Sequence, residues 1–150
     1  MTRHLLLVPS LACPASCKYC FGPHQGNGSM SVDTLRAVIR WQHRLGDVEP
    51  VEITFHGGEP LLPGLEFYRQ ALPALSDGLG DRLRGFAMQS NLWCITPDLC
   101  DPFQQYRLNL GTSLDGPQAL NDAQRGSGYF QRTMQGIRLA QSRGLEIQGS

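Results

Sequence analysis

Short apolar runs of strand length alternate with longer helical stretches along the 150 residues of this chain. This β-α-β-α order favours a parallel sheet covered by helices, because consecutive parallel strands need a crossover connection that is usually helical. The expected strands are His4–Val8, Val51–Phe55, Gly85–Gln89 and Leu108–Ser113, with a fifth starting at Gly144–Ile147. The expected helices are Val32–Leu45, Leu65–Leu75 with Pro73 in its last turn, one that begins near Pro97 and Asp98, and Tyr129–Arg143. The sequence therefore predicts an α/β fold.

The composition describes one globular domain without a strong electrostatic field. The chain is 41% hydrophobic, and its 13 basic and 13 acidic residues give a formal charge of zero. A neutral chain does not attract nucleic acid or an anionic membrane over long range, so neither is expected as a partner. The apolar start is too short for a membrane span and has no cleavage pattern of a signal peptide, which predicts a cytoplasmic protein.

Three cysteines lie within eight residues, directly after the first expected strand. Cys13, Cys17 and Cys20 are too close together for a disulfide framework, and five cysteines in total is an odd number, so metal binding in a reducing compartment is expected. Three thiolates are one fewer than a closed iron–sulfur or zinc site uses, and a cluster held by three cysteines keeps one iron open. A zinc site with His24 as the fourth ligand is the alternative, although no second pair of ligands follows. Cys94 and Cys100 are expected to be inert buried thiols, with ligation of an auxiliary cluster as the alternative.

Residues of unusual type also follow the later strands. Gly57-Gly58-Glu59-Pro60 comes after the second strand, Ser90-Asn91 after the third, and Leu114-Asp115-Gly116-Pro117 after the fourth. The carboxyl ends of parallel strands meet at one edge of the sheet, so these loops are expected to converge with the cysteines. The two glycines let the backbone approach a ligand closely, and Glu59 supplies an acceptor for an ammonium group.

These motifs carry a resemblance to the radical S-adenosylmethionine enzymes. The C-x3-C-x2-C spacing with Tyr19 before the last cysteine resembles their cluster motif, and the same Gly-Gly-Glu-Pro run occurs in that family. Ser113-Leu114-Asp115-Gly116-Pro117, the later Arg125 and the Gly128-Tyr129-Phe130 segment are similar to one branch, the peptide-modifying enzymes typified by anaerobic sulfatase maturases. Gln89-Ser90-Asn91 is similar to a Gln-Thr-Asn segment of that branch, with Leu92-Trp93 where the family usually has glycine.

The resemblance implies a fold, two cofactors and their ligands. The fold would be the N-terminal portion of a partial β/α (TIM-like) barrel. Cys13, Cys17 and Cys20 would hold a 4Fe-4S cluster, whose open iron chelates S-adenosylmethionine. The residues implied to contact S-adenosylmethionine are Tyr19, Gly57, Gly58, Glu59, Asn91, Ser113 and Arg125. His56 occupies the position from which the maturases direct a glutamine toward their peptide, so it implies a different substrate or a capping role. No residue is assigned as catalytic.

The implied activity is reductive cleavage of S-adenosylmethionine to a 5′-deoxyadenosyl radical that abstracts hydrogen from a peptide or protein substrate. The electron would come from a donor such as a flavodoxin or ferredoxin. Residues 1–150 would form an incomplete radical S-adenosylmethionine core, without the last barrel strands or any auxiliary-cluster domain. The alternatives are a zinc-binding interaction module without catalysis and an inactive remnant of the enzyme.

Overall fold

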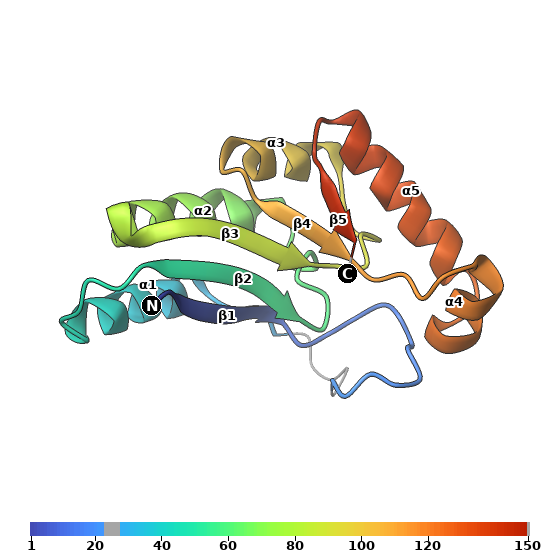
Figure 1. Cartoon of the computed structure of the whole chain (residues 1–150), viewed down its shortest axis with the longest axis horizontal. Coiled ribbons are helices and arrows are strands. Elements are labelled where there is room, and N and C mark those ends of the chain that lie inside the picture. Colours follow the sequence, from blue (N-terminus) through green and yellow to red (C-terminus); the bar gives the residue numbers. More distant parts are fainter. Residues whose placement is uncertain (23–27, 150) are drawn as a thin grey trace.

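Five parallel strands form a single sheet in which the strands follow one another in chain order (Figure 1). The computed structural model describes residues 1–22 and 28–149. The strands are β1 (Arg3–Ser10), β2 (Val51–Gly57), β3 (Leu83–Gln89), β4 (Asn109–Thr112) and β5 (Ile147–Gly149). The helices are α1 (Val32–Arg44), α2 (Leu65–Leu79), α3 (Pro97–Gln105), α4 (Gln118–Arg125) and α5 (Tyr129–Ser142), with a 3₁₀ turn at Gly80–Arg82. The α/β class and the partial barrel arrangement expected from the sequence are confirmed.

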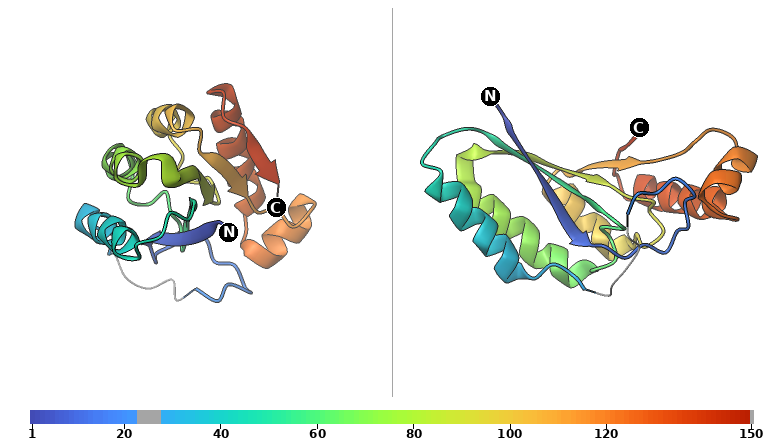
Figure 2. Two further views of the ribbon diagram at one scale, coloured as in Figure 1. Left: turned by 60° about the vertical axis from the view of Figure 1, so that its left-hand side comes forward. Right: turned by 90° about the horizontal axis from the view of Figure 1, so that it is seen from below.

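The sheet is curved, and its helices lie on the outer side. Figure 2 (left) shows α1, α2, α3 and α5 as an outer arc around the inner arc of strands. The outer face of the sheet is apolar: Ile53 and Phe55 of β2 pair in register with Phe86 and Met88 of β3, and all four side chains are buried in the core. Burial of this face against the helices drives folding.

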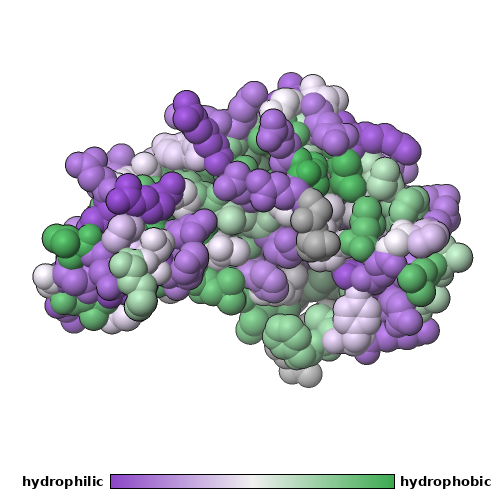
Figure 3. All heavy atoms as spheres, in the orientation of Figure 1, coloured by the Kyte–Doolittle hydropathy of each residue, from purple (hydrophilic) through white to green (hydrophobic). Residues whose placement is uncertain are grey.

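The inner face carries smaller and more polar side chains. Thr54 pairs in register with Ala87, and Glu52 with Gly85, one residue out of phase with the buried set. Successive strand residues point to opposite faces of a sheet, so this second set of residues lies on the concave face. Hydrophilic and hydrophobic side chains are mixed on the face of the molecule in Figure 3.

Helix α2 is longer than the sequence pattern predicts. The prediction that this helix ends at Leu75 is wrong, because α2 continues past Pro73 to Leu79. Proline removes one helical hydrogen bond and crowds the preceding turn. The burial of Leu72, Leu75 and Leu79 in the core stabilises the continued helix enough to offset this cost.

Helix α4 is absent from the sequence prediction. Its periodic pattern is polar, and its one buried residue is Asn121. The Asn121 carboxamide accepts a hydrogen bond from Asp115 N (2.8 Å) and donates to Gly116 O (2.6 Å). A polar side chain therefore anchors this helix to the loop after β4, and a search for hydrophobic spacing does not detect it. None of the helices in the described residues has the length and hydropathy needed to cross a bilayer.

Candidate functional site

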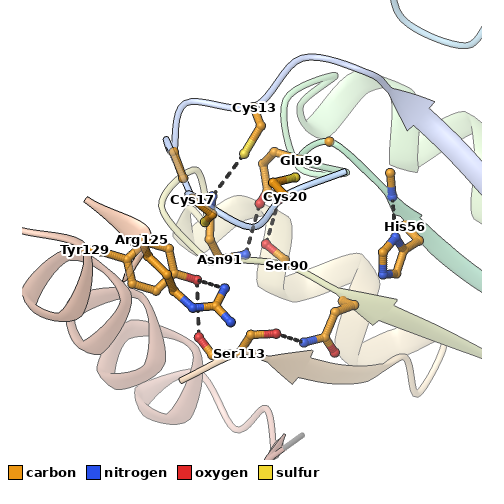
Figure 4. A pocket seen from close by; sticks show the side chains of 14 residues that line it. Cys13, Cys17, Cys20, His56, Glu59, Ser90, Asn91, Ser113, Arg125 and Tyr129 are labelled. Atoms are coloured by element: carbon orange, nitrogen blue, oxygen red, sulfur yellow. Dashed lines mark hydrogen bonds between the residues drawn. The ribbon is translucent and has the colours of Figure 1, made fainter. Parts of the chain in front are cut away.

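A pocket lies at the carboxyl edge of the sheet, where the loops after β1 to β4 meet (Figure 4). It is open to solvent, and the space inside it, open solvent included, is about 570 Å³. Its lining consists of Cys13, Ala15, Cys17, Cys20, His56, Gly57, Gly58, Glu59, Gln89, Ser90, Asn91, Ser113, Arg125 and Tyr129. Of the site residues expected from the sequence, all except Tyr19 line this one pocket.

The cysteine loop is held from two sides by main-chain hydrogen bonds. On one side, Gly58 N donates to Ser10 O (3.1 Å) and Glu59 N to Ala12 O (2.7 Å). On the other, Lys18 N donates to Gln124 O at the end of α4 (2.8 Å). The loop that carries the three thiols is therefore fixed against both β2 and α4.

The thiols are partly removed from water. Burial raises the pKa of the Cys13 thiol to about 11, and the nearby charge of Glu59 adds to the effect. Burial also raises the pKa of Cys17, while the positive charge of Arg125 opposes the shift. Binding of iron requires the thiolate form, so assembly of a metal centre here has to release protons.

The three cysteines are a donor set that fits an iron–sulfur cluster. In residues 1–22 and 28–149, no group of three or more His, Cys, Asp or Glu side chains is arranged to hold one metal ion. The three cysteines nevertheless line one pocket, and thiolates are the usual ligands of iron–sulfur clusters, where each binds a different iron. His24, the proposed fourth ligand of the zinc alternative, lies outside the described residues.

Glu59 ties the loop after β2 to the loop after β3. Its side chain accepts hydrogen bonds from Ser90 Oγ (2.6 Å), Leu61 N (3.0 Å) and Asn91 N (3.0 Å), and the residue is only 1% exposed. Burial raises the pKa of Glu59, although the three hydrogen bonds favour the charged form. The carboxylate therefore shapes the pocket wall, and most of its acceptor capacity is used within the protein.

We expect Glu59→Gln to lower the free energy of unfolding by about 1–3 kcal/mol. Both oxygens of the Glu59 carboxylate accept hydrogen bonds, whereas glutamine has only one acceptor oxygen. Its NH₂ group would replace the other oxygen and face a buried N–H or O–H donor. Urea unfolding followed by circular dichroism measures the effect. Glu66→Gln on the exposed first turn of α2 is the matched control, and equal stability of both variants would contradict the structural role of Glu59.

Ser113 and Gln89 form a hydrogen-bonded pair on the opposite wall. Gln89 Nε2 donates to Ser113 Oγ (2.6 Å) across the β3–β4 neighbours. Because the serine oxygen accepts this bond, its own O–H is available as a donor. Ser113 can therefore offer a hydrogen bond to a ligand carboxylate or hydroxyl.

Arg125 is already paired with a carboxylate of the protein. Its Nε lies 2.6 Å from Asp115 Oδ2 and its Nη2 lies 3.0 Å from Asp115 Oδ1, a bidentate geometry. The rings of Tyr19 and Tyr129 lie 5.2 and 5.1 Å from its guanidinium carbon. Although burial alone would lower the pKa of Arg125, the hydrogen bond to Asp115 raises it above its usual value. Arg125 thus brings a fixed positive charge to the pocket.

Tyr19 lies outside the pocket lining and is 53% exposed. Its hydroxyl donates to Asp115 Oδ2 (2.7 Å), and partial burial together with this bond raises its pKa to about 12. The side chain fastens the cysteine loop to the loop after β4. The contact of Tyr19 with S-adenosylmethionine stays a prediction.

Leu92 follows β3 in a turn with an unusual backbone conformation. Its φ angle is +62°, in the left-handed region that costs a non-glycine residue about 1–2 kcal/mol. Leu92 is 1% exposed, so its burial offsets the strain. Helix α5 approaches this turn at Gly136, where an added Cβ would overlap the carbonyl oxygen of Leu92. Packing of the buried Leu92 side chain and of α5 therefore supports this turn.

His56 and the two remaining cysteines have local roles in the structure. His56 Nδ1 accepts a hydrogen bond from Gly57 N (2.7 Å), which is the capping role considered from the sequence, while its ring also lines the pocket. Cys100 is buried and Cys94 is half-buried, as expected of inert thiols.

Four residues of this network were not assigned a role from the sequence: Gln89, Ser90, Asp115 and Tyr129. Each lies in or beside one of the sequence motifs that follow the strands. The sequence does not indicate which residues of separate loops form hydrogen bonds with one another.

The curved parallel β/α sheet is a partial β/α barrel, and three cysteines line the pocket at its carboxyl edge. The family model for the Radical SAM superfamily matches residues 7–149. The chain belongs to this superfamily.

The chain is similar to parts of longer proteins. An uncharacterized protein of Methanothermobacter thermautotrophicus is 44% identical over 147 residues, which cover 98% of this chain and 56% of that protein. The serine-type anaerobic sulfatase-maturating enzyme of Bacteroides thetaiotaomicron is 30% identical, over 89% of this chain and 35% of that enzyme. The structure of native anSMEcpe with bound AdoMet superposes with a TM-score of 0.83 at 22% identity, over 99% of this chain and 43% of that chain. The chain thus spans between a third and just over half of these relatives' lengths.

Proposed function

We propose that the chain forms the cofactor-binding part of a radical S-adenosylmethionine enzyme. Cys13, Cys17 and Cys20 would hold a 4Fe-4S cluster, and S-adenosylmethionine would bind beside it. The observation that carries the proposal is that three thiols share one pocket with the loops after β2, β3 and β4. When bound, these groups would supply radical chemistry for the abstraction of hydrogen from a substrate.

The chain's own residues would bind and orient S-adenosylmethionine. The main chain at Gly57 and Gly58, with Glu59 and Asn91 behind it, forms one wall of the pocket. Ser113 on the other wall has a hydroxyl donor for the ribose or carboxylate. Arg125 would act on the cofactor carboxylate through its charge, because Asp115 already occupies two of its donors.

We infer that the substrate is a peptide or protein. The support is the similarity to sulfatase-maturating enzymes, together with related structures described as anSMEcpe with AdoMet and a Cp18Cys peptide and as Streptococcus suis SuiB with its precursor peptide SuiA. An electron donor of the flavodoxin or ferredoxin class, in the cytoplasm, completes the proposal.

Anaerobic reconstitution with iron and sulfide tests this proposal. We expect equimolar iron and acid-labile sulfide, and a change in the electron paramagnetic resonance spectrum of the reduced protein when S-adenosylmethionine is added. Ser113→Ala should weaken that response, because a neutral hydrogen bond contributes about 0.5–1.5 kcal/mol. Ser142→Ala, an exposed serine on α5, is the control. A colourless protein with one zinc would favour the interaction module, and a cluster that does not respond to S-adenosylmethionine would favour an inactive remnant.

A further inference from the structure

The side chain of Asn91 contacts the sulfur of Cys13. Asn91 Nδ2 donates to Cys13 Sγ at 3.7 Å, within the range of an N–H···S hydrogen bond, and Figure 4 shows this contact as a dashed line. The two residues are 78 positions apart in the chain, and the contact joins the loop after β3 to the cysteine loop. It is a direct polar contact to one of the three thiols.

The orientation of the Asn91 carboxamide is determined by its other bonds. Asn91 Oδ1 accepts a hydrogen bond from Trp93 N (3.0 Å), which identifies the oxygen end. The amide nitrogen is therefore the end that faces Cys13. The main-chain N–H of Asn91 donates to Glu59 Oε2 (3.0 Å), which holds the residue from the opposite side.

The turn around Asn91 is also held by neighbouring contacts. Leu92 N donates to Ser90 Oγ (2.9 Å), and the buried Leu92 packs where Gly136 lets α5 approach. Trp93 Nε1 donates to Thr133 Oγ1 on α5 (3.0 Å). With both neighbours fixed, the carboxamide has little freedom to turn away from the sulfur.

We propose that Asn91 is a positioning residue that raises the reduction potential of the cluster through its N–H···S hydrogen bond to Cys13. This inference rests on the proposed function, in which Cys13 binds an iron of a 4Fe-4S cluster. A reduced cluster carries more negative charge on its sulfur ligands, so an N–H dipole directed at one sulfur stabilises the reduced state more than the oxidised state. The role differs from contact with S-adenosylmethionine, which the sequence implied for Asn91.

Potentiometric titration of the reconstituted chain, followed by electron paramagnetic resonance without S-adenosylmethionine, tests the inference. In Asn91→Ala we expect the ratio of reduced to oxidised cluster at a fixed potential to fall about tenfold, which is about 59 mV for a one-electron couple. Asn109→Ala, at an exposed asparagine of β4, should keep the parent midpoint. An unchanged midpoint in Asn91→Ala, with weaker binding of S-adenosylmethionine, would overturn the inference and restore the cofactor contact.

A second variant and a measurement on the parent keep the test decisive. Asn91→Asp has nearly the same shape but directs a carboxylate at the thiolate, so its midpoint should lie below that of Asn91→Ala. In the parent labelled with ¹⁵N at asparagine side chains, we expect a weak nitrogen coupling to the reduced cluster, and its absence would overturn the inference even if both variants fail to fold. A parent without iron would instead contradict the proposed function.

Discussion

Cys17→Ala is expected to lose most of its iron and sulfide on anaerobic reconstitution, while the folded chain remains. Three thiolates would carry the whole cluster, so each removal takes away a third of the protein ligands. Loss of a partner that merely supports a metal ligand typically lowers metal affinity by about 10- to 100-fold, and loss of the ligand itself should cost more. Iron and sulfide analysis, with the visible absorption of the cluster, measures the effect.

Cys94→Ala is the matched control for this experiment. Cys94 is also a half-buried free cysteine, but it does not line the pocket. We expect this variant to assemble the parent amount of cluster, and circular dichroism should report the same secondary structure for both variants. Full cluster content in Cys17→Ala would remove the three-cysteine assignment.

The fold was predictable because most of its strands and helices have local signals in the sequence, such as apolar runs and helix-terminating glycines. The apolar runs of β2 and β3 bury the same face of the sheet, and Gly46, with a φ of +67°, follows α1 as a stop. Helix α4 was not predictable in this way. Its anchor, Asn121, is polar and acts through hydrogen bonds to the preceding loop, which leave no hydrophobic period in the sequence.

The site was predictable as a set of residues but not as a set of contacts. The cysteines, the glycines and Ser113 could be found because their types are unusual after strands. The pairing of Arg125 with Asp115 and Tyr19 depends on how α4 folds back over the cysteine loop, and no local pattern contains that information. For the same reason, the sequence did not indicate that Asp115 binds the Arg125 guanidinium, and the contact of Arg125 with a cofactor carboxylate stays a prediction.

The ion pair of Asp115 with Arg125 contributes a stability that depends on pH. Hydrogen bonding to Arg125, together with the bond from Tyr19, lowers the pKa of Asp115 below its ordinary value near 3.8. A carboxyl with a lowered pKa in the folded state contributes stability above its unfolded pKa and loses it as the pH falls through the folded value. The contribution is therefore complete at neutral pH and is lost progressively as the pH falls below the unfolded value near 3.8.

The glycine at position 58 predicted a close approach of the backbone, but not which group approaches it. Two adjacent glycines indicate close approach of the backbone to something, and the sequence alone favoured a bound ligand. In the structure, a Cβ at Gly58 would overlap the carbonyl oxygens of Leu11 and Ala12. The glycine is needed for packing of the loop after β2 against the cysteine loop, and it lines the pocket as a consequence.

Gly58→Val is therefore expected to displace the cysteine loop, and not only to weaken binding of S-adenosylmethionine in an intact fold. Overpacking against main-chain atoms costs about 1–3 kcal/mol. The displaced loop carries Cys13, so cluster content should fall together with the free energy of unfolding. Urea unfolding and iron analysis of the same preparations measure both quantities.

Gly85→Val separates this effect from the general consequence of adding a branched side chain to the sheet. Gly85 lies in β3, where an added Cβ meets no atom within 4 Å, and valine is well suited to a strand. We expect parent stability and cluster content in this control. If Gly58→Val instead kept both and lost only affinity for S-adenosylmethionine, the glycine would act at the ligand and not at the loop. If stability and cluster content both fall in Gly58→Val but not in Gly85→Val, packing against the loop after β2 holds the cysteine loop in position.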